Sequence, residues 1–231
     1  MQMVDVNDYL ANVAQIVRKC PTVTLRHAYM RAFREWCQQT QWLKTNVPGA
    51  TVANQSQYSL GNDPDLDIVG IYAMQAALAT TASAAGPSIW YLPPSDSSNW
   101  NPNVQAEQPT RYCYIPEAQF ALYPTPDQVY TLAVTVILAP NEAAVNVPLA
   151  PLVKYSNDIE AGALAYLYEI PGQSWTNVAQ ADKKQRAFQS GISNGKAETQ
   201  RNYNTGAQRA NPRPFGGGFN NRYPGGSIGY W

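Results

Sequence analysis

Histidine and cysteine are scarce in this sequence of 231 residues, which has one histidine and three cysteines. His27 falls on a polar helix face and is expected at the surface, so no Ser–His or Cys–His pair is available for nucleophilic catalysis. Cys20, Cys37 and Cys113 have no CxxC spacing, and one histidine cannot complete an ordinary structural zinc site with them. We therefore expect free, buried or half-buried thiols in a reducing compartment.

Long hydrophobic runs and phosphate-binding motifs are also missing. No run of about 18 apolar residues is present, and the first residues lack the apolar core of a signal peptide, so no membrane partner is predicted. Neither a GxxxxGK[ST] loop nor a strand–GxGxxG–helix unit occurs. Asp63, Asp65 and Asp67 alternate as in a calcium loop, but Pro64 interrupts them and the closing Glu is absent. The sequence thus predicts no enzyme, and no catalytic, cofactor-binding or metal-binding residue.

Residues 203–231 differ in composition from the rest of the chain, with seven Gly, three Pro, six aromatic residues, three Arg and no acid. Glycine and proline break regular elements, and without Leu or Val the segment cannot build a core. A solvated linker does not need so many rings, so we interpret the segment as a docking arm. A disordered terminus and a single-strand nucleic-acid arm are the alternatives. The predicted docking residues are Arg209, Arg213, Phe215, Phe219, Arg222, Tyr223, Tyr230 and Trp231.

The net charge is zero, but acidic and basic side chains are distributed unevenly along the chain. Residues 48–147 carry one basic side chain, Arg111, and eight acidic ones, whereas residues 1–47 carry six basic and three acidic ones. Residues 201–231 carry four Arg and no acid. This asymmetry favours head-to-tail association of like copies, or a positive end that meets an acidic partner.

Helical periodicity occurs near both ends of the chain. Apolar residues on one face predict helices over 6–19, 23–43, 152–169 and 176–200. The first apolar face contains Val6, Leu10, Val13, Ile16 and Val17, and either Thr22 or Thr24 can cap the second helix. The second helix presents a stripe for packing, and two small residues favour a close approach of the third. These packing residues are Leu25, Tyr29, Phe33, Trp36, Gly162 and Ala163.

Between the helical parts, short runs of β-formers are punctuated by Pro, Asn, Ser and Gly. The predicted strands are 56–60, 67–74, 88–92, 111–115, 118–123 and 129–138. The fold class is α+β: a helical bundle with two N-terminal and two C-terminal helices, an inserted antiparallel sandwich or barrel-like domain, and an extended C-terminal arm. The predicted boundaries are 1–47, 48–147, 148–202 and 203–231.

Three packing patterns resemble the head-to-tail adaptor, or connector, proteins of short-tailed bacteriophages. The first covers the predicted second helix: Leu25-x-x-Ala28-Tyr29-x-x-Ala32-Phe33-x-x-Trp36-Cys37-x-x-Thr40-x-Trp42. The second is Tyr155-x-x-Asp158-Ile159-x-x-Gly162-Ala163-Leu164-Ala165-x-Leu167, followed by Pro171-Gly172-x-x-Trp175. The third is Tyr123-Pro124-x-Pro126. Together they span about residues 5–200, in the family's order and with a β insert between the helical parts.

The resemblance implies a structural virion protein without an active site or cofactor. Such a protein forms a ring of about twelve copies. The ring joins the portal to the tail nozzle or tube, and genomic DNA passes through its lumen without sequence-specific binding. The implied location is the neck of the virion, after assembly in the host cytoplasm. The family also implies packing roles for Gly162, Ala163 and Trp175, and a portal partner for the arm.

A second reading is a carbohydrate- or receptor-binding β-domain of a phage tail. Trp90, Tyr91, Trp100 and Tyr112 could stack on sugar rings, and the long loop 93–109 could shape a site. Packing in a core or interface is the competing role for these aromatic residues. An image of the purified protein would separate the two functions, because the adaptor predicts a ring and the β-domain predicts a monomer or trimer.

Overall fold

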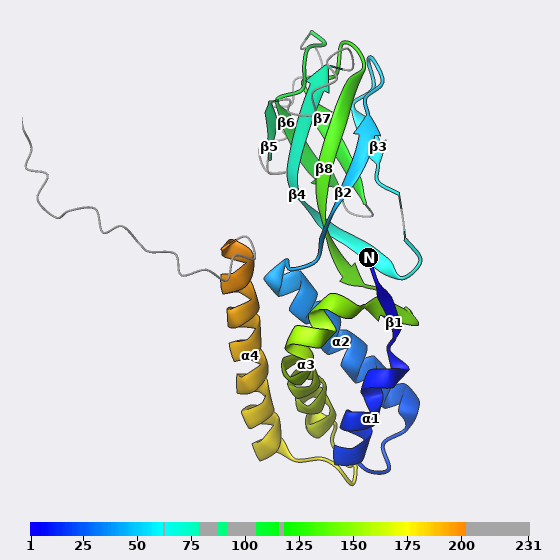
Figure 1. Ribbon diagram of the computed structural model, residues 1–231, viewed down its shortest axis with the longest axis vertical. Coiled ribbons are helices and arrows are strands. Elements are labelled where there is room, and N and C mark those ends of the chain that lie inside the picture. Colours follow the sequence, from blue (N-terminus) through cyan, green and yellow to red (C-terminus); the bar gives the residue numbers. More distant parts are fainter. Residues whose placement is uncertain (62, 79–86, 92–104, 116–117, 202–231) are drawn as a thin grey trace, which may run out of the picture.

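The computed structural model describes residues 1–61, 63–78, 87–91, 105–115 and 118–201. It is a mixed α+β structure in which the helices gather at one end and a curled sheet at the other (Figure 1). In the part that is described, the chain runs through one short strand and two helices, then the other strands, then two more helices. The predicted start of the arm and all predicted arm residues from 203 on lie outside the described residues.

The helices are α1 (Asn7–Ile16), α2 (Thr22–Thr40), α3 (Leu149–Glu169) and α4 (Val178–Gln200). The predicted helices are thus found, with shifted ends. α2 starts at Thr22 after Pro21, and no side chain caps it, so the predicted threonine cap is wrong. It ends before Gln41, which adopts a left-handed conformation with φ of 52°. The prediction of Ile16 on the buried face of α1 is also wrong, because α1 ends there and its side chain is 52% exposed.

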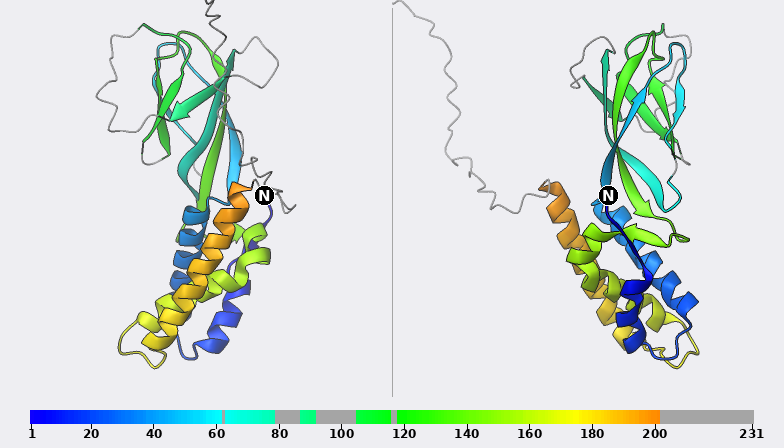
Figure 2. Two further views of the ribbon diagram at one scale, coloured as in Figure 1. Left: turned by 90° about the vertical axis from the view of Figure 1, so that its left-hand side faces the viewer. Right: turned by 45° about the vertical axis from the view of Figure 1, so that its right-hand side comes forward.

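α3 begins three residues earlier than the periodicity indicated. Pro151 lies in its first turn, where a missing backbone N–H costs no helical hydrogen bond. α4 begins after Asn177, whose side chain accepts a hydrogen bond from the Gln180 backbone N–H at 3.1 Å. Neighbouring helices pack on one another, with α3 in contact with both α2 and α4 (Figure 2).

The seven-stranded sheet has the spatial order β2-β8-β4-β5-β6-β7-β3. Its strands are β2 (Lys44–Ala50), β3 (Gln57–Ser59), β4 (Leu66–Leu78), β5 (Ser88–Tyr91), β6 (Arg111–Ile115), β7 (Gln119–Tyr123) and β8 (Tyr130–Pro140). Two register shifts in the β4–β8 ladder, at Ile68/Gly70 and Ile71/Ala73, are irregularities that bend strands. The sheet curls so far that its two edge strands, β2 and β3, line the same small cavity of about 160 Å³.

Two features of the strands differ from the sequence prediction. β5 and β6 pair in parallel, so the sheet is mixed and not wholly antiparallel. β2 lies where no strand was predicted, because Pro48 and Gly49 interrupt its sequence. Proline is tolerated on an edge strand, where its missing N–H breaks no ladder. A separate two-stranded ribbon pairs β1 (Met3–Asp5) with β9 (Asn146–Pro148), and both strands are too short to show a period.

Polar contacts fix the sheet to the helices at Arg34 of α2. Its guanidinium forms an ion pair with Asp67 of β4 at 2.5 Å and donates to the Pro140 carbonyl oxygen at 3.0 Å. The Asn141 side chain donates to the other Asp67 oxygen at 3.1 Å. One residue of α2 is therefore held by two long strands that run down from the sheet (Figure 1).

Glu198 of α4 holds the far end of that helix against α3. Its carboxylate accepts a hydrogen bond from the Tyr155 hydroxyl and forms an ion pair with Lys154 at 2.6 Å. The Glu198 side chain is 14% exposed, and the Lys154 side chain is 47% exposed. Burial tends to raise the pKa of Glu198, but the hydrogen bonds from Lys154 and Tyr155 outweigh it and leave the pKa below its usual value.

Replacing Glu198 by Gln should therefore lower the free energy of unfolding by about 1–2 kcal/mol at pH 7, mainly through the tyrosine contact. A carboxylate with a depressed pKa stabilises the fold above its unfolded-state pKa, and this stabilisation is lost as the pH falls through the folded-state pKa. Denaturant unfolding at pH 7 and pH 3 tests this. The difference between wild type and variant should shrink at pH 3, while the exposed Glu169→Gln control should show little difference at either pH. If the difference in unfolding free energy between wild type and Glu198→Gln persists at pH 3, the Glu198 carboxylate is not the source of this stabilisation.

Candidate interaction surfaces

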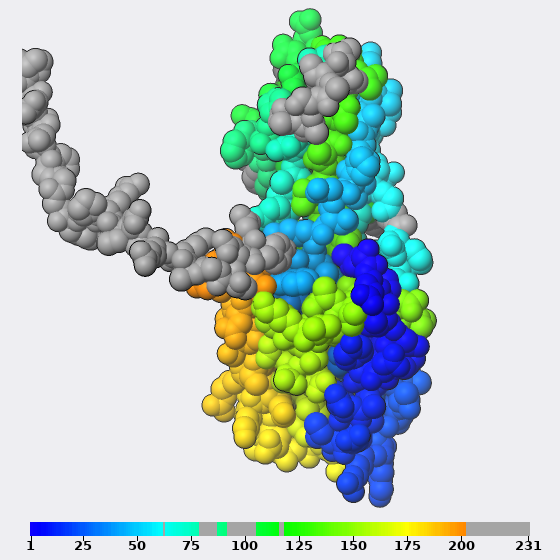
Figure 3. Space-filling view, viewed as in Figure 1, coloured from blue at the N-terminus to red at the C-terminus, as the bar shows by residue number. Residues whose placement is uncertain are grey.

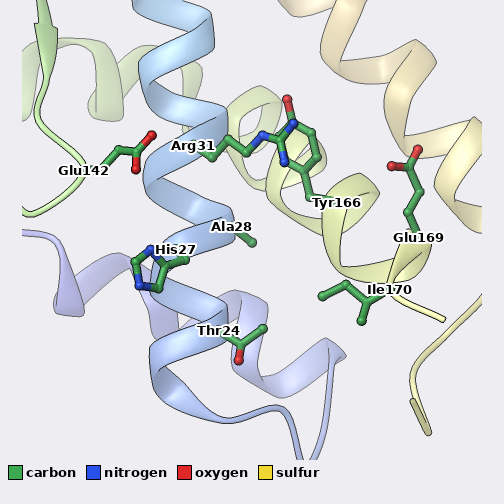
Figure 4. Close-up of a pocket in the computed structure, with 8 residues that line it drawn as sticks. All are labelled: Thr24, His27, Ala28, Arg31, Glu142, Tyr166, Glu169 and Ile170. Carbon is green, nitrogen blue, oxygen red and sulfur yellow. The ribbon is translucent and has the colours of Figure 1, made fainter. Parts of the chain in front are cut away.

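An open cavity of about 380 Å³ lies between α2, the end of α3 and the β8–β9 connection. Figure 4 shows Arg31 reaching from α2 onto the ring of Tyr166 of α3, with Ile170 and Glu169 on the far side. The Arg31 guanidinium carbon lies 4.3 Å from the ring centroid, a cation–π contact. The cavity is lined by Thr24, His27, Ala28, Arg31, Glu142, Tyr166, Glu169 and Ile170.

The polar group of Tyr166 at this cavity is already paired within the subunit. The Tyr166 hydroxyl donates a hydrogen bond to Glu35, and burial together with this bond raises the pKa of Tyr166 to about 12. The hydroxyl is thus a neutral donor at physiological pH and already has an acceptor. Among the described residues, no three His, Cys, Asp or Glu side chains lie close enough to hold a metal ion. The absence of enzymatic activity stays a prediction.

The predicted packing residues lie in the helical core. Leu25, Tyr29, Phe33 and Trp36 of α2 are at most 2% exposed, as is Ala163 of α3. Gly162 faces the Phe188 ring and Ala32, so three helices meet at this glycine. Trp175 lies between α3 and α4, half-buried against the same core.

The cysteines and the histidine lie as the sequence indicated. Cys37 and Cys113 are buried and Cys20 is half-buried, and all three are free thiols. Burial raises the pKa of each, most strongly that of Cys37, which disfavours the reactive thiolate. His27 is exposed on α2, at the rim of the cavity.

The aromatic residues considered for sugar binding separate in the structure. Trp90 is 72% exposed and Tyr91 is 54% exposed, both on β5. Tyr112 is 4% exposed and packs against Tyr91 with ring centroids 5.6 Å apart, so its proposed role as a stacking platform is wrong. Trp100 and most of the 93–109 loop lie outside the described residues.

The family described as SU10 adaptor protein matches residues 5–212. The chain belongs to this family. The match includes the helices, the sheet and the start of the predicted arm, and it agrees with the resemblance to phage head-to-tail adaptors. A comparison with curated protein sequences found no match. Family membership makes the chain an adaptor, a structural component of the virion that contacts other phage structural proteins.

The described helices include none that is long and apolar enough to cross a bilayer. Sequence reasoning did not find the cavity on this adaptor. Its lining residues come from α2, from the end of α3 and from the segment after β8, which are far apart in the chain, and no short motif connects them. The one available signal was the polar face of α2 with His27 and Arg31.

Proposed function

We propose that this adaptor forms a ring of about twelve copies that joins the portal to the tail nozzle. The observation that carries the proposal is the family match across residues 5–212. In the ring, the helices form a bundle and the curled sheet acts as a barrel-like module. Genomic DNA passes through the lumen with no sequence-specific contact. The ring is a structural element of the neck, assembled in the host cytoplasm, and performs no reaction.

The shape of the subunit supports this proposal. The sheet and the helices occupy opposite ends of an elongated molecule, so one end can face the head and the other the tail (Figure 1). The Arg34–Asp67 contact holds the two ends together. A subunit with two distinct ends can bridge two different partners, which a ring between portal and nozzle requires.

Negative-stain imaging of the purified protein, alone and mixed with portal, tests the proposal. We expect rings, or portal particles that carry an additional ring. A chain that ends at residue 202 should keep its melting temperature, because the composition of 203–231 gives it no part in the core, and it should co-sediment less with portal. Compact monomers or trimers that never bind portal would reject the adaptor ring. Unchanged co-sedimentation of the shortened chain would reject the docking arm alone.

A carbohydrate-binding role is the second candidate, and the exposure of Trp90 favours it. An indole that is 72% exposed on a sheet is available to stack on a sugar ring. The burial of Tyr112 removes one member of the predicted site. Trimers in the same images, with glycan binding that is lost in Trp90→Ala, would support this role over the ring.

A further inference from the structure

One margin of the molecule, the outward face of α4, is basic. The buried residues of this helix, such as Ala181, Phe188 and Ile192, face α2 and α3. At 100° per residue, Lys183 and Arg186 lie on the opposite side of the helix. Both are exposed, as is Arg201 just after the helix, while Asp182 is the only exposed acid along α4. We refer to Lys183, Arg186 and Arg201 as the basic margin.

A second margin is acidic and is assembled from three distant segments. Asp5 ends β1, Asp8 lies in the first turn of α1, Asp63 precedes β4, and Glu142 follows β8; all four are exposed. We call these four residues the acidic margin. None of them takes part in either of the ion pairs found among the described residues.

Backbone hydrogen bonds hold the three segments of the acidic margin together. β1 pairs with β9, so that Asp5 lies opposite Asn146. The Val6 N–H donates to the Val145 carbonyl at 3.1 Å, and the Asn141 N–H donates to the Asp65 carbonyl at 2.9 Å. The neighbouring cations are already engaged: Arg26 donates to two carbonyls at positions 143 and 144, and Arg34 pairs with Asp67. Arg31 and His27 share the cavity with Glu142, but Arg31 lies over Tyr166.

The two margins lie on opposite sides of the subunit. In Figure 1, α4 is on the left, and β1, β9 and the connection into β4 are on the right. Figure 3 shows the same separation on the surface, with the gold and orange α4 opposite the dark blue N-terminal segment and the cyan connection. Both margins lie at the helical end or at its junction with the sheet. Identical copies placed side by side therefore bring opposite charges together.

We propose that the basic margin of one copy binds the acidic margin of the next copy in the ring. This inference rests on the proposed ring and names the surfaces that close it. A contact between two different faces is heterologous, and it closes into a ring when each copy is rotated by a constant angle. Complementary charge at the rim of an interface speeds association and disfavours wrong registers. The proposed contact therefore joins two opposite sides of the helical end of the subunit.

Charge reversal of each margin, alone and combined, tests the contact. The variant Lys183→Glu/Arg186→Glu has two acidic margins, and the variant Asp8→Lys/Glu142→Lys has two basic ones. We expect each alone to show ring formation weakened about tenfold or more in low salt. An equimolar mixture should form rings again, because the two chains can alternate around a ring with an even number of copies. The chain with all four substitutions should also form rings by itself.

Arg18→Glu/Lys19→Glu is the matched control for the α4 variant, since it makes the same change in net charge at two exposed residues just after α1. It should form rings as wild type does. If a reversal variant fails to fold, as circular dichroism would show, the neutral pairs Lys183→Gln/Arg186→Gln and Asp8→Asn/Glu142→Gln replace it. These neutral variants should weaken ring assembly several-fold. Raised salt should weaken ring assembly of the wild type more than that of the neutral variants.

The outcomes separate this inference from the ring itself. If wild type forms no ring alone or on portal, the proposed function fails. If wild type forms rings and the folded reversal variants do so equally well, the ring stands and the paired margins are wrong. The paired margins are also wrong if reversal on α4 changes only DNA retention, because the basic margin would then face the lumen. Rescue in the mixture is the result that only a direct contact between the two margins explains.

Discussion

Replacing Trp36 by alanine should lower the melting temperature of the free subunit by about 6–20 °C, since truncating a buried Trp costs roughly 3–5 kcal/mol. Trp36 is fully buried at the centre of the helical core. Its ring lies 4.8 Å from the Tyr155 ring and 6.3 Å from the Trp42 ring, measured between centroids. Gly195 of α4 also packs against it, so the indole lies against α3, α4 and the turn after α2. Thermal melting followed by circular dichroism measures the effect.

Trp36→Phe provides the sharper comparison. The Trp36 Nε1 is buried and makes no hydrogen bond within the described residues, so the indole loses a hydration partner on folding without gaining another. Phenylalanine removes that unpaired donor and keeps most of the ring contacts. It should cost much less than alanine, about 1 kcal/mol or less. The exposed Gln38→Ala on the same helix should change the melting temperature little. If Trp36→Ala has the same melting temperature as the Gln38→Ala control, the Trp36 ring does not stabilise the helical core.

The helical core could be predicted from the sequence because its information is local. The stripe from Leu25 to Trp36 repeats at the helical period, so its apolar side chains lie on one face of the helix. That face is buried whichever element the helix packs against. The small residue Gly162 likewise indicated a close helix contact. Helix ends were less predictable, since Gln41 ends α2 through its backbone conformation although Trp42 and Leu43 continue the apolar composition.

The strands were predicted less completely because pairing is not local. A run such as Ser88–Tyr91 indicates a strand but gives no direction for its partner, and β5 in fact runs parallel to β6. β2 contains Pro48 and Gly49, residues that argue against a strand except at an edge. Whether a segment lies at an edge depends on the whole sheet, so its sequence alone cannot show it.

The surfaces proposed for assembly are the least visible in the sequence. Asp8 and Glu142 are far apart in the chain, and only the pairing of β1 with β9 brings their segments together. The sequence alone shows that the middle of the chain is acidic and that both ends are basic. It could not show that an acid near the N-terminus joins the acids of the middle on one side of the fold. The predicted docking residues from Arg209 on lie outside the described residues and stay predictions.

Replacing Gly162 by valine should destabilise the fold by roughly 1–3 kcal/mol or more, because the new side chain overpacks a close helix contact. A Cβ atom at this position would lie 2.8 Å from two carbons of the Phe188 ring and 3.0 Å from the Ala32 Cβ. Phe188 is fully buried and Ala32 belongs to α2, so neither can move without shifting a helix. Even Gly162→Ala, which by helix propensity alone would gain up to about 1 kcal/mol, should lose stability here.

The cause of that loss can be tested by enlarging the space opposite the glycine. In a Phe188→Leu background the planar ring is gone, and the penalty of Gly162→Ala should become smaller than in the wild-type background. Denaturant unfolding of the four chains gives this coupling as a double-mutant cycle, in which residues in direct contact differ from additivity by about 0.5–3 kcal/mol. Equal penalties in both backgrounds would show that α3 and α4 do not meet at this pair. A gain in stability from Gly162→Ala alone would show that propensity outweighs the contact, and that the three helices can separate here at little cost.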